Sequence, residues 1–307
     1  TKGEKPKTVQ HLNDRVLIVD GLNTFIRSFA VNPALNEDGL HIGGMVGFMK
    51  SVRYSCDILK PSRCIIVFDG KGGSKRRQKI YPEYKGTRKV KRRLNRNVDW
   101  GTAPADEQQS MKQQMGRLIE YLEQLPLTLV SVDGIEADDT MAYISQQLLP
   151  KSDCILMSTD KDFIQLQKFA NVSQWDPVRK RKVSDNDPEN YLIEHILKGD
   201  RGDGVPNALS QDDVFVSGGR QKPMRQTIMQ KIKQVVNEVP LEKINGEFEW
   251  AKGFHRNRKL VDLQYTPDYL REEILEQYNV DPGGREKLFN YFVKRKLNNL
   301  VENISEF

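Results

Sequence analysis

Two patterns of apolar residues alternate along the first half of the chain. Short, nearly continuous apolar runs, which predict buried β-strands, occur at residues 15–20, 63–69, 127–132 and 153–159. A fifth strand is predicted at 171–175, followed by a basic hairpin over 176–183. Strands that are apolar throughout, instead of at every second position, are typical of a parallel sheet covered on both faces.

Helical spacing separates these strands. Over residues 42–59 apolar side chains recur at intervals of three and four, and the same holds over 106–124. Shorter helices are predicted at 138–149, where Pro150 ends the pattern, and at 162–168. The alternation predicts an α/β fold, with a mostly parallel central sheet and helices on both faces. Ligands of such sheets bind beyond the carboxyl ends of the strands.

The strand signal fades after residue 188. Helices are predicted at 191–198, 224–238, 267–279 and 284–296, and turn-rich loops at 200–206 and 211–223. We therefore divide the chain into an α/β domain, residues 1–187, and a smaller, mainly helical region, residues 188–307.

Composition excludes several classes of protein. Of 307 residues, 37% are hydrophobic, which is enough for a sizeable core, yet no apolar run is long enough to cross a membrane. The first residues contain no apolar segment of the kind that begins a secretory signal. Three cysteines without a Cys-x-x-Cys pair argue against disulfides and a zinc knuckle, and four scattered histidines argue against a histidine-built zinc site. We expect a cytoplasmic protein with no membrane partner.

Carboxylates follow the predicted strands. They are Asp20, Asp69, Glu136, Asp138, Asp139, Asp160 and Asp162, and a later loop adds Asp200 and Asp203. Each alone is explained by a turn or a helix N-cap. Together they place up to nine acids from five segments near one edge of the sheet, where like charges raise one another's pKa. Hard divalent cations such as Mg²⁺ relieve that repulsion, and two such ions about 4 Å apart are a common device for phosphodiester hydrolysis.

Positive charge is concentrated in one segment. The chain carries a net charge of +6, but residues 71–96 hold twelve Lys or Arg and one acid, and the remainder has 36 basic against 41 acidic residues. A basic run alone is typical of a solvated face or a disordered tail. However, Tyr81, Tyr84 and Trp100 are interleaved with this segment and can stack on bases. If the segment becomes helical on DNA, Arg77 and Lys85 share one face and reach the scissile phosphate.

These motifs resemble the 5′-nuclease (flap endonuclease) superfamily along nearly the whole chain, and most closely its ribonuclease H branch in T-even-type phages. The resemblance rests on the strand-ending acids Asp20 and Asp69 and on the boxes at residues 136–139, 158–163 and 197–203. The basic positions Arg77, Lys85 and Arg88 and the closing residues 303–307 also match. The resemblance implies a PIN-like 5′-nuclease fold, with residues 70–104 as a basic arch that orders on DNA.

The resemblance also implies a function. It indicates a Mg²⁺-dependent 5′→3′ exonuclease and 5′-flap endonuclease acting on RNA–DNA and DNA–DNA duplexes, which removes lagging-strand RNA primers during phage-type DNA replication. Mn²⁺ is expected to substitute. The first ion would be held by Asp20, Asp69, Glu136, Asp138 and Asp160, and the second, partly through water, by Asp139, Asp162, Asp200 and Asp203. We expect a monomer, with a single-strand-binding protein or a sliding clamp as further partners.

Other residues are expected to contact the substrate. Lys85 and Arg77 are the expected catalytic cations, and the DNA-binding positions are Arg76, Tyr84, Arg88, Lys89, Arg92, Arg93, Arg220 and Lys222. The chain departs from many relatives after Gly204, where it lacks the Gly-x-Gly-Ile-Gly hairpin that grips duplex phosphates. We therefore expect duplex binding without a potassium-coordinating hairpin. Residues 217–222 offer substitute phosphate contacts or form a plain mobile loop.

Two other classes of function fit the sequence less well. A non-catalytic branched-DNA-binding protein on a nuclease-like fold would have no use for so many costly acids. A small-molecule phosphohydrolase lacks its usual Asp-x-Asp, because Asp20 is followed by Gly-Leu-Asn, and no phosphate-binding loop of the nucleotide hydrolases is present.

Overall fold

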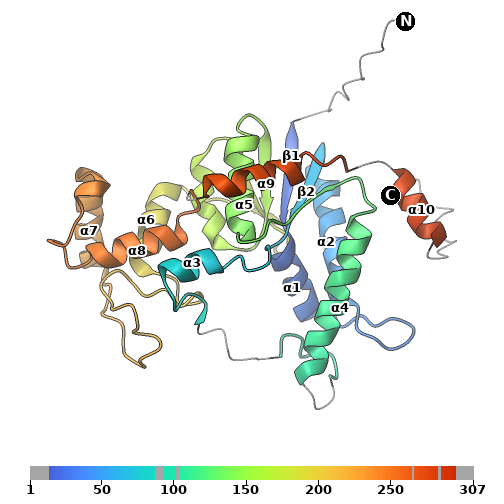
Figure 1. The fold of residues 1–307 in the computed structure, drawn as a ribbon, viewed down its shortest axis with the longest axis horizontal. Helices are drawn as coiled ribbons and strands as arrows, with labels where there is room; N and C mark the ends of the chain where they lie inside the picture. The colour runs from blue at the N-terminus through green and yellow to red at the C-terminus, as the bar shows by residue number, and fades with distance from the viewer. Residues whose placement is uncertain (1–13, 87–92, 101–103, 265, 283–284, 295–307) are drawn as a thin grey trace, which may run out of the picture.

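The computed structural model describes residues 14–86, 93–100, 104–264, 266–282 and 285–294, and its centre is a six-stranded sheet (Figure 1). The strands lie in the order β3-β2-β1-β4-β5-β6. Their bounds are β1 Arg15–Asp20, β2 Arg63–Val67, β3 Thr128–Val130, β4 Asp153–Met157, β5 Val172–Asp176 and β6 Arg181–Val183. All neighbouring pairs are parallel except β5 and β6. The predicted α/β fold with a mostly parallel sheet is confirmed.

Helices cover both faces of this sheet. One face packs on α1 (Gly21–Val31), α2 (Gly43–Leu59) and α4 (Pro104–Leu122), and the other on α5 (Ala137–Tyr143) and α9 (Asp268–Tyr278). Strand β1 serves both cores, because Leu17 and Val19 point to the first face while Val16 and Ile18 point to the second. This explains why the strand is apolar at every position instead of alternating.

A second group of helices extends the molecule to one side (Figure 1). It contains α6 (Pro188–Lys198), α7 (Gln226–Glu238), α8 (Ala251–Val261) and a short turn at Leu241–Lys243, and α3 (Lys75–Ile80) lies beside α8. The helix α10 (Arg285–Lys294) follows α9. Tyr81 and Tyr84 pack among these helices, whereas α9 returns to the sheet and adds Leu270 and Ile274 to its core. Each side of the predicted boundary at residue 187 therefore contributes side chains to the core of the other.

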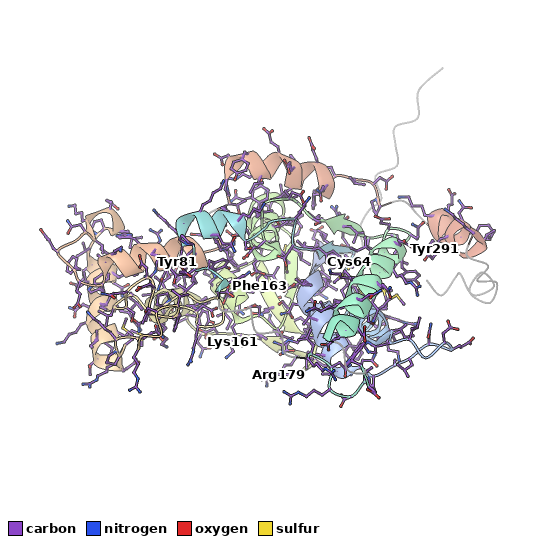
Figure 2. All side chains as sticks on the ribbon, turned by 60° about the horizontal axis from the view of Figure 1, so that its bottom comes forward. Cys64, Tyr81, Lys161, Phe163, Arg179 and Tyr291 are labelled. Atoms are coloured by element: carbon purple, nitrogen blue, oxygen red, sulfur yellow. The ribbon has the colours of Figure 1, made fainter. Side chains whose placement is uncertain are left out.

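The aromatic residues of the basic segment are buried. Tyr81, Tyr84 and Trp100 are 2%, 3% and 7% exposed, so their rings are packing groups in this structure and do not present a stacking surface. Trp100 stacks on Phe29, with ring centroids 5.7 Å apart. Figure 2 shows Tyr81 on the side of the second group of helices, α6, α7 and α8, and Phe163 near the centre of the molecule.

A helix long enough to place Arg77 and Lys85 on one face is not formed in this structure. Helix α3 stops at Ile80, Tyr81 is extended, and Pro82 follows. Lys85 has a φ of 58°, in the left-handed region, so it lies in a turn and not on the helix face of Arg77. Among the described helices, none has the length and apolar character needed to cross a bilayer.

Candidate metal centre

The first acid of the centre lies at the junction of β1 and α1. Asp20 caps α1: its Oδ1 accepts a hydrogen bond from the Asn23 backbone N–H (3.0 Å). Its Oδ2 accepts from the Ser158 hydroxyl (2.8 Å), which lies just beyond β4. The two central strands are thus joined at their carboxyl ends through this side chain, which is 5% exposed.

The next acids connect β2 to α5. Asp69 is exposed, and its Oδ1 accepts from the Ala137 backbone N–H (2.8 Å). Gly70 lets the chain after β2 approach the loop between β3 and α5, because a Cβ atom there would lie 1.6 Å from the Val132 carbonyl oxygen. This contact brings the start of α5, with Glu136 and Asp138, to the edge formed by β1 and β2.

Two further segments complete the acidic group. Asp160 caps the 3₁₀ helix Lys161–Lys168 and accepts from the Asp162 N–H (3.0 Å). In the loop after α6, Asp200 Oδ1 accepts from Gly202 N–H (2.6 Å) and Asp203 N–H (3.1 Å). These bonds fix the turn that presents Asp203.

Electrostatic interactions identify which acids form one cluster. Burial raises the pKa of Asp20 to about 7, with repulsion from Asp69 and Asp160 adding to the effect. Burial likewise raises the pKa of Asp138, which is repelled by Asp20, Asp160, Asp162 and Glu136. Burial raises the pKa of Asp162 to about 7 as well, with repulsion from Asp160, Asp200 and Asp203. The carboxylate cluster therefore contains Asp20, Asp69, Glu136, Asp138, Asp160, Asp162, Asp200 and Asp203.

This donor set suits a hard divalent cation. Carboxylate oxygens are the preferred ligands of Mg²⁺ and Mn²⁺. Buried carboxylates that resist ionisation when bare are stabilised as anions by a cation among them. The residues present therefore fit the metal that the sequence predicts.

His195 also lies at the centre, although it is not among the ligands predicted from the sequence. It lies in the last turn of α6, with Nδ1 3.5 Å from Asp162 Oδ1 and Nε2 3.8 Å from Asp200 Oδ2. Burial disfavours the imidazolium, but Asp200 and Asp162 outweigh it and raise the pKa of His195. In turn His195 lowers the pKa of Asp200.

Tyr84 and Lys85 cover one side of the cluster. The Tyr84 hydroxyl lies 2.8 Å from Asp203 Oδ2 and 3.1 Å from Glu136 Oε2, so its single proton is donated to one or the other. The Lys85 ammonium donates to Glu136 Oε1 (2.6 Å), and its backbone N–H donates to the Asp203 carbonyl (2.7 Å). Both residues thereby connect the base of the basic segment to acids from α5 and the later loop.

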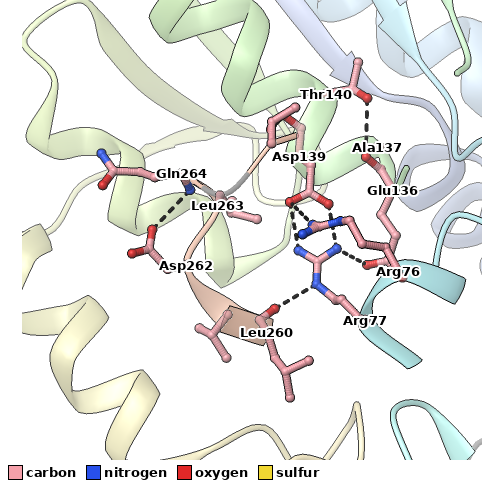
Figure 3. Close-up of polar contacts among 12 residues, drawn as sticks. Arg76, Arg77, Glu136, Ala137, Asp139, Thr140, Leu260, Asp262, Leu263 and Gln264 are labelled. Carbon is pink, nitrogen blue, oxygen red and sulfur yellow. Dashed lines mark hydrogen bonds and ion pairs between the residues drawn. The ribbon is translucent and has the colours of Figure 1, made fainter. Parts of the chain in front are cut away.

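Arg77 and Asp139, with Arg76, form a buried ion cluster that adjoins the carboxylate cluster at Glu136 (Figure 3). Arg77 is 2% exposed and Asp139 is fully buried. Two hydrogen bonds join them, Nη1 to Oδ2 (2.6 Å) and Nη2 to Oδ1 (2.9 Å), and Arg76 Nη2 lies 3.0 Å from the same Oδ1. Arg77 also donates to Glu136 Oε2 (3.0 Å) and to the Leu260 carbonyl (2.8 Å).

This arrangement differs from the predicted roles. Both oxygens of Asp139 accept from guanidinium groups, so the structure places this carboxylate outside the acidic cluster. Burial disfavours the Arg77 charge, but Asp139 and Glu136 raise its pKa above the usual value. The guanidinium is buried and donates hydrogen bonds to Asp139, Glu136 and the Leu260 carbonyl.

The other predicted DNA contacts are dispersed. Arg93 and Arg220 are exposed, and the Lys222 ammonium pairs with Glu249. Arg76 is bonded to Asp139. Arg88, Lys89 and Arg92 lie outside the described residues.

Known proteins are similar to this chain in sequence. A family model described as the 5′-3′ exonuclease N-terminal resolvase-like domain matches residues 15–194, and one described as T4 RNase H, C terminal, matches residues 186–307. The ribonuclease H of Enterobacteria phage T4 is 31% identical over 192 residues. The match covers 60% of this chain and 61% of the phage protein, which is less than two thirds of that protein's length. A flap endonuclease Xni of a Shewanella species is 30% identical over 203 residues, covering 63% of this chain and 69% of that protein.

A solved structure has the same fold. The flap endonuclease of bacteriophage T5, in a complex with DNA and metal ions, aligns with a TM-score of 0.61 over 86% of this chain and 98% of the phage chain, at 20% identity.

Proposed function

The chain belongs to the 5′-3′ exonuclease family, and from that premise we propose that it is a Mg²⁺-dependent 5′→3′ exonuclease and 5′-flap endonuclease. The observation that carries the proposal is the cluster of eight carboxylates from five segments at the carboxyl edge of the sheet. An acidic cluster built at such cost in burial and repulsion is explained by cations that act on phosphodiesters.

The acids have assigned roles in this proposal. We assign the first cation to Asp20, Asp69, Glu136, Asp138 and Asp160, and the second to Asp162, Asp200 and Asp203. Bound divalent cations supply an activated water and stabilise the charge of the leaving oxygen. Asp139 and Arg77 are left out of the ligand and catalytic sets, because each is already bonded to the other.

Lys85 is the proposed catalytic cation. Its side chain is 24% exposed, and its ammonium lies against Glu136 at the rim of the cluster. A phosphate oxygen that approaches the centre from the side of Tyr84 and Lys85 meets this ammonium, which would stabilise the charge that develops during cleavage.

The substrate class follows from charge and from the relatives. We propose RNA–DNA and DNA–DNA duplexes with 5′ ends or flaps, and removal of RNA primers in phage-type replication, because a ribonuclease H and flap endonucleases are among the relatives. Arg93, Arg220 and Lys222 would hold phosphates along the duplex.

The test is cleavage of end-labelled nicked and 5′-flapped duplexes, with magnesium and then with EDTA. We expect 5′ products with magnesium only, and none from Asp138→Asn, which still binds the duplex. Asp268→Asn, which alters an exposed carboxylate paired with Arg271, is the matched control and should cleave like the wild type. Binding without cleavage by the wild-type chain would favour a non-catalytic branched-DNA-binding protein instead.

A further inference from the structure

His195 gives the carboxylate cluster a nitrogen donor. It lies in the last turn of α6, Asp162 lies in the first turn of the neighbouring 3₁₀ helix, and Asp200 follows α6 by two residues. One ligand atom from each of the three side chains can be chosen so that all lie within 4.8 Å of one another. Around a cation with bonds of about 2.1 Å, adjacent octahedral ligands are about 3.0 Å apart and opposite ones about 4.2 Å. The three side chains are thus close enough to share one ion with little movement.

The two imidazole nitrogens have different surroundings. Nδ1 is buried and makes no hydrogen bond, although it faces Asp162 Oδ1 at 3.5 Å. Nε2 faces Asp200 Oδ2 at 3.8 Å. A buried nitrogen without a partner is costly, and a cation between Nδ1 and Asp162 would satisfy it.

We infer that His195 is a nitrogen ligand of the second cation, together with Asp162 and Asp200, and that this position therefore selects Mn²⁺, Co²⁺ or Zn²⁺ over Mg²⁺. Imidazole suits these transition metals, whereas Mg²⁺ prefers oxygen ligands. The inference rests on the proposed function only in treating Asp162 and Asp200 as cation ligands.

A competing account is a protonated His195 that merely neutralises the two carboxylates. The two accounts predict different results with bound Mn²⁺. If His195 is a ligand, its nitrogen couples to the manganese, and the site favours Mn²⁺ over Mg²⁺. An imidazolium counter-charge produces no coupling and affects all divalent cations alike.

The experiment is pulsed electron paramagnetic resonance on the full chain loaded with Mn²⁺, without DNA. We expect ¹⁴N modulation from coordinated imidazole in the wild type, its loss in His195→Gln, and its retention in His255→Gln. His255 is the control, because its Nε2 lies 2.6 Å from the Ile244 carbonyl in the C-terminal helices. His195→Asp, which substitutes an oxygen donor, should bind Mn²⁺ without the modulation.

A competition measurement adds the selectivity. Displacement of half of the Mn²⁺ from the second site should need about tenfold more Mg²⁺ in the wild type than in His195→Gln. Absence of ¹⁴N modulation in the wild type, its persistence in His195→Gln, or equal Mg²⁺ requirements in both proteins would overturn the inference.

Failure of this inference is distinguishable from failure of the proposed function. A chain that cleaves flapped duplexes with Mg²⁺ but shows no ¹⁴N modulation lacks only the nitrogen ligand. A chain that shows the modulation but cleaves no duplex binds the metal through His195 and is not the proposed nuclease.

Discussion

Replacing Arg77 by Met would measure how much stability is lost when the buried ion cluster loses its central cation. The change removes two hydrogen bonds to Asp139, one to Glu136 and one to the Leu260 carbonyl. Asp139 is fully buried, so its charge would be left with Arg76 as its remaining cation. Removing one partner of a buried ion pair typically costs about 3–5 kcal/mol. Because Arg76 still lies 3.0 Å from Asp139, we expect the lower end of that range.

The assay is urea unfolding of the full chain, followed by circular dichroism. Arg76→Met is the control: it loses one contact to Asp139 from a side chain that is 14% exposed, so we expect about 1–2 kcal/mol. The double variant Arg77→Met with Asp139→Leu removes both charges, and should recover most of the stability lost by Arg77→Met alone.

One result would refute this reasoning. The free energy of unfolding of Arg77→Met could lie within about 1 kcal/mol of the wild-type value, well below the cost of an unpaired buried charge. If cleavage also became much slower, Arg77 would act on the substrate. That outcome would restore the catalytic role predicted from the sequence.

Four further predictions concern the centre and its surroundings. Tyr84→Phe removes the hydroxyl between Glu136 and Asp203, and should weaken Mg²⁺ binding about tenfold in calorimetry; unchanged affinity would show that the hydroxyl does not position these acids. Asp20 and Asp162 have pKa values of about 7 without metal, so Mg²⁺ binding should release protons near pH 6 and few above pH 9. Calorimetry in buffers of different ionisation enthalpy measures this release, because the binding heat then changes with the buffer. Because these folded-state pKa values exceed that of an unfolded carboxyl, the folded chain binds more protons between about pH 4 and 7, and its metal-free stability should fall as the pH rises through that window; stability that rises there would contradict the burial of these acids. Arg220→Ala should weaken duplex binding modestly and reduce the salt slope by about one unit, and an unchanged slope would remove Arg220 from the interface.

The sheet was predictable because its strands are apolar throughout. Strand β1 has the predicted bounds, and the other strands differ from prediction by a few residues at their ends. The convergence of Asp20, Asp69 and Asp160 follows from that topology alone, since parallel strands bring their carboxyl ends to one edge. Helices α1, α3 and α8 were not predicted. In α3 the reason is clear, because a mostly basic segment has no apolar face to reveal it.

Pairings between distant residues could not be predicted. Nothing in the sequence distinguishes Asp139 from Asp138, yet the helix turns one to Arg77 and the other to the carboxylate cluster. His195 was missed for a similar reason. Spacing along the chain shows the four histidines far apart, whereas the acids beside His195 come from the 3₁₀ helix Lys161–Lys168 and from the loop after α6. The signal that could have found it is position: a histidine one turn before Asp200 lies on the helix that delivers this acid.

The contact between Lys85 and Asp203, and that between Arg77 and Leu260, have a consequence for synthesis on the ribosome. Arg77 and Leu260 are 183 positions apart, so the first meets the second only when most of the chain has been translated. A nascent chain that ends before Asp203 lacks the loop that completes the acidic cluster and the carbonyl that holds the Lys85 turn. The loop after α6 must therefore be translated before the carboxylate cluster can be complete, and the end of α8 before Arg77 has all its partners.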